Sequence, residues 1–278
     1  MLANLNDVLK KAQQEHYAVG LFNTIDTDML EAVISVAEEM DSPVIIGTAQ
    51  VLLPYGELAL LAPSARAAAE RAKVPVVLHY DHGTTFEKCM EALKLGFSSV
   101  MFDGSANDVE ENLAETAQIV RIAHAMGASV EGEIGHVGLA ANDEGLLTDM
   151  YTTPEEAVRF VQETGVDALT VAIGTAHGVY KTKPCLDIGR LSQIRAALDT
   201  PLVLHGGSGL SDDDFRNTIA AGIAKVNIFT DLCVAGAEAM RRGIEKGEDY
   251  LHIRNMRVAD IKAAVGRKIE LFGSAGKK

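Results

Sequence analysis

Eight short apolar runs recur along the chain, about thirty residues apart, and segments with a helical spacing of apolar positions lie between them. Each run is nearly continuous in Val, Ile, Leu and Ala, which is typical of parallel strands buried on both faces. The runs are 17–22, 43–47, 75–79, 98–102, 128–134, 168–173, 201–205 and 224–229. We predict a strand in each of them.

The segments with helical spacing include 26–40, 84–95, 108–125, 154–164 and 211–221. Thr153 is followed by Pro154, a pair that favours a helix start, and Asn107 is the expected N-cap of the helix at 108–125. Several segments are followed by a glycine, which favours the left-handed conformation that ends helices. These glycines are Gly96, Gly127, Gly165 and Gly222.

Strands that alternate with helices along a whole chain form a parallel sheet, and eight such units favour closure into a TIM (β/α)8 barrel of the α/β class. A doubly wound sheet of six or seven strands is the alternative if the count of eight is wrong. No linker or low-complexity tract divides the chain, so we predict a single barrel domain over residues 1–278. The helical pattern at 255–271 predicts an extra C-terminal helix that packs beneath the barrel or against a second subunit. Residues 272–278 are expected to be mobile.

The composition excludes several classes of partner. The formal net charge is −14, from 25 basic and 39 acidic residues, which argues against binding to nucleic acid or to an anionic membrane. No apolar run approaches the roughly 20 residues that span a bilayer, and the start of the chain does not resemble a signal peptide. The three cysteines (Cys89, Cys185 and Cys233) are too widely spaced for a Cys-rich zinc site. We therefore expect a cytoplasmic protein.

Histidines gather where the predicted strands end, which is where TIM barrels place their chemistry. His82, His177 and His205 follow the third, sixth and seventh strands, so the barrel would bring them to one rim. Three imidazoles with one open position are typical of catalytic zinc, since a structural site is closed by a fourth protein ligand. His79 lies slightly earlier in the chain and is expected to contact a ligand rather than the metal.

Asp81 adjoins His82 at the same rim. Its carboxylate is suited to moving a proton to or from a substrate hydroxyl. It is equally suited to orienting an imidazole ligand, and the spacing alone does not separate the two roles.

A glycine-rich loop after the seventh strand, together with the end of the eighth strand, predicts a phosphate site. Gly206, Gly207 and Ser208 follow the seventh strand, and residues 227–230 end the eighth strand ahead of a helix. TIM barrels commonly hold a phosphate there on backbone N–H groups at a helix N-terminus. Such a site suits an acidic protein because backbone N–H groups bind the phosphate locally, without an overall positive charge on the protein.

These motifs resemble those of the class II (metal-dependent) ketose-bisphosphate aldolases, which include fructose- and tagatose-1,6-bisphosphate aldolases. The resemblance covers nearly the whole chain and is carried by ordered motifs at matching spacing. They are residues 18–23, 42–46, 79–83, 131–135, 171–178, 204–209 and 225–228.

The resemblance implies reversible cleavage of a ketose 1-phosphate or ketose 1,6-bisphosphate to dihydroxyacetone phosphate and an aldehyde. It implies one zinc per subunit on His82, His177 and His205 acting as a Lewis acid, Asp81 as the proton-transfer residue, and a second metal position at Asp103 and Glu133. The implied substrate-binding residues are Asn23, Gly178, Gly206, Gly207, Ser208, Asn227, Ile228, Phe229 and Thr230. A monovalent cation near the phosphate site and a homodimer or homotetramer are also expected.

The chain departs from the family pattern after Gly135, where alanines occupy a region that is often acidic. The residue that exchanges a proton on the enediolate is therefore left open among His136, Asp143 and Glu144. The loop at 136–151 is long for a connection and is expected to act as a lid. The identity of the ketose and its stereochemistry at C4 are also left open.

Three other hypotheses compete with this one. A Schiff-base aldolase would need a lysine inside the barrel, but Lys225 is expected at the opposite rim and Lys181 in a loop. A non-catalytic accessory subunit should have lost the histidines or the aspartate, and the chain keeps all four. A zinc-dependent hydrolase does not explain the two predicted phosphate loops.

Overall fold

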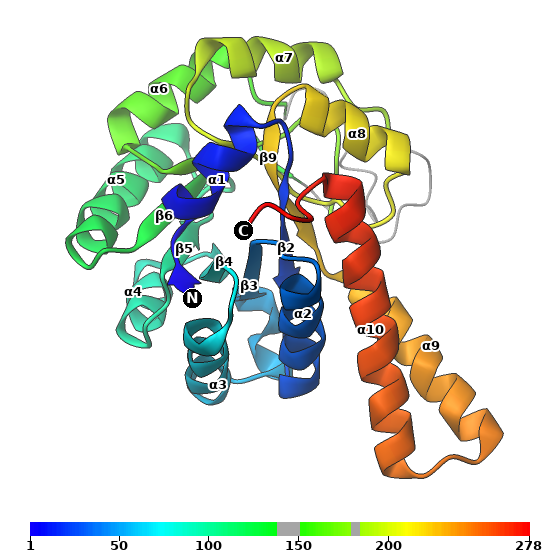
Figure 1. Ribbon diagram of the computed structural model, residues 1–278. Helices are drawn as coiled ribbons and strands as arrows, with labels where there is room; N and C mark the ends of the chain where they lie inside the picture. The colour runs from blue at the N-terminus through cyan, green and yellow to red at the C-terminus, as the bar shows by residue number, and fades with distance from the viewer. Residues whose placement is uncertain (138–150, 179–183) are drawn as a thin grey trace.

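Within residues 1–137, 151–178 and 184–278, which the computed structural model describes, eight parallel strands form a closed barrel surrounded by helices (Figure 1). The barrel strands pair in chain order, and β4 pairs with β5 while β9 pairs with β2, so the barrel has no free edge. They are β2 (Val19–Asn23), β3 (Val44–Ala49), β4 (Val76–Gly83), β5 (Ser99–Phe102), β6 (Ser129–Ile134), β7 (Ala168–Val171), β8 (Leu202–Leu204) and β9 (Ile223–Ile228). The predicted TIM barrel is confirmed, with each strand close to its predicted range.

The helices follow the strands in the predicted alternation. They are α1 (Leu5–Gln14), α2 (Thr27–Glu39), the 3-10 helix η1 (Gln50–Tyr55), α3 (Leu58–Arg71), α4 (Phe86–Lys94), α5 (Val109–Ala125), α6 (Pro154–Thr164), α7 (Ile188–Ala197), α8 (Asp212–Ala220), α9 (Thr230–Lys246) and α10 (Tyr250–Phe272). Thr153 caps α6 as predicted. The predicted cap of α5 is wrong by one residue, because Asp108 rather than Asn107 accepts the N–H of Glu111. No helix in the described ranges could cross a membrane.

Alternate residues of each strand face the barrel interior. Leu21, Val77 and Val203 pack inside with Leu5 and Leu9 of α1, which lies across the end of the barrel where the strands begin. Intervening strand residues such as Phe22 and Leu78 pack against the outer helices instead. A short strand, β1 (Leu2–Ala3), pairs with the beginning of β4 at the same end. This end of the barrel is therefore apolar, and polar interior side chains are concentrated toward the other end.

The α9–α10 pair extends away from the barrel, and α10 packs along α9 and α2 (Figure 1). Ion pairs hold α10 to α2, because Arg254 and Arg257 contact Asp28 at 2.8 and 3.1 Å. The extra C-terminal helix therefore packs beside the barrel rather than beneath it.

The expected mobility of residues 272–278 is wrong. Ser274 is fully buried and hydrogen-bonds Ser42 at 2.9 Å, while the N–H of Gly276 donates to the Met40 carbonyl at 2.8 Å. The segment is held by these contacts against the turn between α2 and β3.

Candidate active site

A cavity of about 580 Å³ lies where the barrel strands end. Its wall includes Asp81, His82, His177 and Asp103 together with all nine predicted substrate-binding residues. Those nine are Asn23, Gly178, Gly206, Gly207, Ser208, Asn227, Ile228, Phe229 and Thr230. His205 and Glu133 are fully buried behind this wall. The predicted proton-transfer and phosphate residues thus line one cavity together with two of the three predicted zinc ligands, His82 and His177.

An irregularity in β4 lets two neighbouring side chains face the cavity. A regular strand would point Asp81 inward and His82 outward. Here the pairing of β4 with β5 shifts between Tyr80 and Gly83, and His82 has a φ of +46°. This local shift re-aims the His82 ring, so that both residues line the cavity.

The rings of His82, His177 and His205 lie together, with centroids 4.5 to 5.8 Å apart. A ring nitrogen of each lies within 4.8 Å of a ring nitrogen of the other two. Nε2 of His82, Nε2 of His177 and Nδ1 of His205 are buried without a hydrogen-bond partner among the described residues. Buried polar atoms rarely remain unpaired, so these three nitrogens suit a metal ion.

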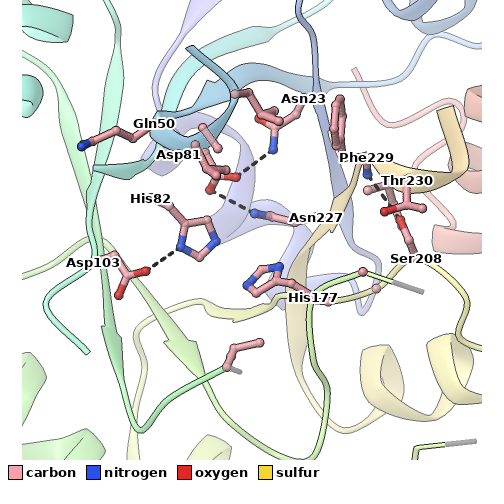
Figure 2. Close-up of a pocket in the computed structure, with 18 of the residues that line it drawn as sticks. Asn23, Gln50, Asp81, His82, Asp103, His177, Ser208, Asn227, Phe229 and Thr230 are labelled. Carbon is pink, nitrogen blue, oxygen red and sulfur yellow. Dashed lines mark hydrogen bonds and ion pairs between the residues drawn. The ribbon is translucent and has the colours of Figure 1, made fainter. Parts of the chain in front are cut away.

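Two carboxylates orient the rings. Asp103 Oδ2 accepts from Nδ1 of His82 at 2.7 Å (Figure 2). Glu131 Oε1 accepts from Nε2 of His205 at 2.9 Å. Each contact uses one ring nitrogen, so the other nitrogen of each ring is the one that could bind a metal. Histidine ligands in metal sites are commonly held in this way.

The electrostatics of the cluster favour a cation. Burial and the neighbouring His82 and His205 lower the pKa of His177 to about 3, which keeps its ring neutral. Burial opposes the charged form of His82, but the Asp81 charge and the Asp103 hydrogen bond outweigh it and raise its pKa to about 10. Burial and the Asp103 charge raise the pKa of Glu133 to about 8. Without a metal, the second ring proton of His82 supplies the positive charge that stabilises the carboxylates of Asp81 and Asp103.

Asp81 is held by two amides. Nδ2 of Asn23 donates to its Oδ2 at 2.8 Å, and Nδ2 of Asn227 donates to its Oδ1 at 3.1 Å (Figure 2). Burial would raise the pKa of Asp81, but the charges of His82 and His205 outweigh it and hold the pKa well below its ordinary value. The result is an ionised, oriented carboxylate beside the three imidazoles.

Asp103 and Glu133 lie beside the histidine cluster. Together with His82 they form a second group whose ligand atoms lie within 4.8 Å of one another. Oε1 of Glu133 accepts the N–H of Val137 at 3.1 Å. Its Oε2 lies 3.6 Å from Nδ1 of His205 and has no hydrogen-bond partner within the described part of the chain. The structure therefore brings together the residues of the predicted second metal position.

Backbone conformation shapes the predicted phosphate loops. Gly206 has a φ of +65°, and a Cβ at this position would lie 2.5 Å from the Ala176 carbonyl oxygen. Gly207 is also closely packed, because its Cβ would lie 2.9 Å from Cγ1 of Val226. Next to these glycines, α9 begins at Thr230, and the first turn of a helix presents unpaired N–H groups.

A family model described as fructose-bisphosphate aldolase class-II matches residues 3–277. The chain belongs to the class II fructose-bisphosphate aldolase family. The chain is 39% identical to fructose-bisphosphate aldolase of Thermus caldophilus, with all of both chains covered. It is 40% identical to 6-phospho-5-dehydro-2-deoxy-D-gluconate aldolase of Shouchella clausii, covering 97% of this chain and 94% of the relative. The crystal structure of the YdjI aldolase from Escherichia coli K12 matches with a TM-score of 0.91 and 38% identity, covering 100% of this chain and 99% of the other.

The predicted family and enzyme class are therefore confirmed, and this class II aldolase is a lyase. The family is generally zinc-dependent. Three imidazoles, each with a buried ring nitrogen that lacks a hydrogen-bond partner among the described residues, suit zinc as ligands.

One side of the cavity in this class II aldolase is lined by residues that were not predicted from the sequence. Gln50, Val51 and Leu52 of η1 and the neighbouring Thr84 line it. Oε1 of Gln50 accepts the N–H of Thr84 at 2.9 Å, which ties η1 to the end of β4. The only signal for these residues was their position directly after predicted strands.

The expected position of Lys225 is wrong. Lys225 lies within β9 and is fully buried inside the barrel, with Nζ 2.8 Å from Oε2 of Glu131. Its ammonium is paired with a carboxylate beneath the cavity, which does not suit a Schiff-base nucleophile.

The remaining predicted residues have mixed outcomes. His79 is fully buried, and its Nδ1 lies 2.7 Å from Oγ of Ser99. Its Nε2 lies 3.8 Å from Oδ1 of Asp81. His136 contacts Oγ of Ser105 at 3.0 Å. Asp143, Glu144, Lys181 and most of the predicted lid fall outside the described residues.

Proposed function

We propose that this class II aldolase reversibly cleaves a ketose 1-phosphate or ketose 1,6-bisphosphate into dihydroxyacetone phosphate and an aldehyde. The observation that carries the proposal is one cavity at which three unpaired imidazole nitrogens, an ionised carboxylate, a closely packed glycine loop and the start of a helix meet. His82, His177 and His205 would hold zinc. Bound there, the metal would supply Lewis acidity toward the ketose oxygens and stabilise the negative charge that develops during C–C cleavage.

Asp81 is the proposed proton-transfer residue. In the cleavage direction its carboxylate takes the proton of the C4 hydroxyl as the C3–C4 bond breaks and the C4 carbonyl forms. The electron pair of the broken bond stays on the dihydroxyacetone phosphate half, where a proton later adds at C3. In condensation the same carboxylic acid returns its proton to the aldehyde oxygen. The donor of the C3 proton stays open among His136, Asp143 and Glu144.

The phosphate of dihydroxyacetone phosphate is proposed to bind the backbone N–H groups of Gly178, of Gly206–Ser208 and of residues 227–230. Replacing Gly206 with alanine should therefore raise the KM for dihydroxyacetone phosphate by about 10- to 100-fold, the loss expected for one charge-assisted hydrogen bond. The reason is steric, because the new methyl group would push the loop away from the Ala176 carbonyl. Condensation kinetics at varied dihydroxyacetone phosphate concentration measure the effect.

Gly127→Ala is the matched control. Gly127 also has a positive φ (+77°), but it has open space around its Cβ position and lies at the end of α5. It should share the backbone strain and leave the KM unchanged. An unchanged KM in Gly206→Ala would remove this loop from the phosphate site.

The far side of the cavity favours an uncharged aldehyde. Figure 2 shows Gln50 and Asp103 on the side of His82 away from Ser208 and Thr230. The described residues on that side are neutral or acidic, and the carboxylate of Asp103 would repel a second phosphate. By their names, the relatives include an aldolase for a bisphosphate and one for a monophosphate sugar acid.

We therefore expect zinc-loaded protein to condense dihydroxyacetone phosphate with glyceraldehyde at a kcat/KM at least about tenfold above that for glyceraldehyde 3-phosphate, a difference of about 1.4 kcal/mol. A panel of aldehydes, scored for coupled product, measures this. Equal or better use of glyceraldehyde 3-phosphate would contradict the preference. The absence of product with every aldehyde would favour the non-catalytic accessory subunit. The homodimer or homotetramer, the monovalent cation and the cytoplasmic location stay predictions.

A further inference from the structure

A buried lysine lies directly beneath the proposed proton-transfer residue. Lys225 and Asn227 are two residues apart in β9, so both point into the barrel. Nζ of Lys225 donates to Oδ1 of Asn227 at 2.7 Å, and Nδ2 of Asn227 donates to Oδ1 of Asp81 at 3.1 Å. Lys225 is therefore joined to Asp81 through a single side-chain amide.

The chemistry of the ammonium group fixes the direction of that amide. A lysine ammonium has only donors, so Asn227 must turn its carbonyl oxygen toward Lys225. Its NH2 group then faces Asp81, which as a carboxylate has only acceptors. With the amide reversed, the Asn227 oxygen would face the carboxylate and repel it. The correct direction depends on the donor at position 225.

Glu131 balances the charge of this lysine. Oε2 of Glu131 lies 2.8 Å from Nζ, and both side chains are fully buried. The other carboxylate oxygen accepts from Thr170 at 2.8 Å and from His205 at 2.9 Å. Removing Lys225 alone would leave Glu131 charged and buried without a counter-ion, which is strongly destabilising. A test must therefore change both members of the pair.

We propose that Lys225 is a positioning residue of this aldolase, which sets the direction of the Asn227 amide and thereby holds Asp81 for proton transfer. The inference rests on the proposed function of Asp81. Lys225 itself acts from beneath the cavity and needs no contact with substrate.

A double-mutant cycle on the rate of C–C cleavage tests the inference. Its members are wild type, Lys225→Met with Glu131→Gln, Asn227→Leu, and the triple variant, all of which keep the buried charges balanced. If Lys225 acts through Asn227, the pair variant and Asn227→Leu should each lower kcat by about 10- to 100-fold. The triple variant should then lose no more than about twofold beyond either, because coupled residues are not additive.

The matched control cycle combines the same pair variant with Ser208→Ala, which alters the phosphate loop and does not contact Lys225. In kcat/KM the loss of the pair variant and the loss of Ser208→Ala should multiply. The loss from Ser208→Ala alone should appear in the KM for the phosphorylated substrate rather than in kcat. Zinc content and the melting temperature are measured on every variant, so that a loss of metal through His205 or a loss of folding is recognised.

Multiplicative losses in the Asn227 cycle, with zinc retained, would overturn the positioning role while leaving the proposed function intact. Unchanged kcat in the folded pair variant would overturn it as well. If wild type itself shows no cleavage, or Asp81→Ala keeps full activity, the proposed function has failed first.

Discussion

Replacing Asp81 with alanine should lower the rate of C–C cleavage by about 10²–10⁴, the usual loss for a general acid–base group, and leave the zinc content near that of wild type. The structure supports this outcome because other carboxylates contact the ligand rings. Asp103 is hydrogen-bonded to the ring of His82, and Glu131 is hydrogen-bonded to the ring of His205. Asp81 instead accepts from two amides and lies open to the cavity.

Asp103→Asn is the matched control, because it changes a carboxylate that orients a ligand. We expect it to weaken zinc binding by the 10- to 100-fold that is typical when such a partner is lost, with activity restored by added zinc. Zinc stoichiometry and cleavage rate are measured in parallel on both variants. Zinc loss in Asp81→Ala equal to that in His82→Ala would reduce Asp81 to a structural residue.

The barrel was predictable because its signal is local. Continuous apolar runs such as 43–47 and 201–205 mark strands covered on both faces, and both are strands in the structure. The site residues were predictable as a set, since chemistry in this fold follows the strand ends. Their position along the chain was enough to predict that His177 and Asp81 meet at one rim, and the structure places both on one cavity wall.

Other features depend on contacts between distant segments. Lys225 was expected at the wrong rim because a lysine within an apolar run is interpretable only with its partner, and Glu131 is on another strand. The shift in β4 that turns His82 into the cavity arises from pairing with β5 and has no local sequence signal. The contact between Gln50 and Thr84 is likewise a property of the folded chain.

The tail illustrates the same limit. A short polar segment with two glycines and two lysines is typical of a mobile terminus. In the fold, Ser274 is buried against Ser42, more than two hundred residues earlier in the chain. The sequence pattern carries no information about that partner.

Replacing His177 with alanine should remove both the zinc and the activity, with cleavage falling below about 1% of the wild-type rate, since a three-ligand site loses most of its affinity with one ligand. Nε2 of His177 is buried and unpaired within the described residues, and burial keeps the ring neutral. A metal ion would give this nitrogen the partner that it lacks. Elemental analysis of gently purified protein should find about one zinc per subunit in wild type and little in the variant.

His79→Gln separates this site from the alternative one. His79, Asp81 and Glu131 also form a group with ligand atoms within 4.8 Å, and all three are buried. Two amides already donate to Asp81, and Lys225 neutralises Glu131, so we expect this group to hold no metal. His79→Gln should therefore retain its zinc. Zinc lost from His79→Gln but kept in His177→Ala would place the metal on the alternative group. Asp81 would then be a metal ligand, and His82, His177 and His205 would lose their proposed role as ligands.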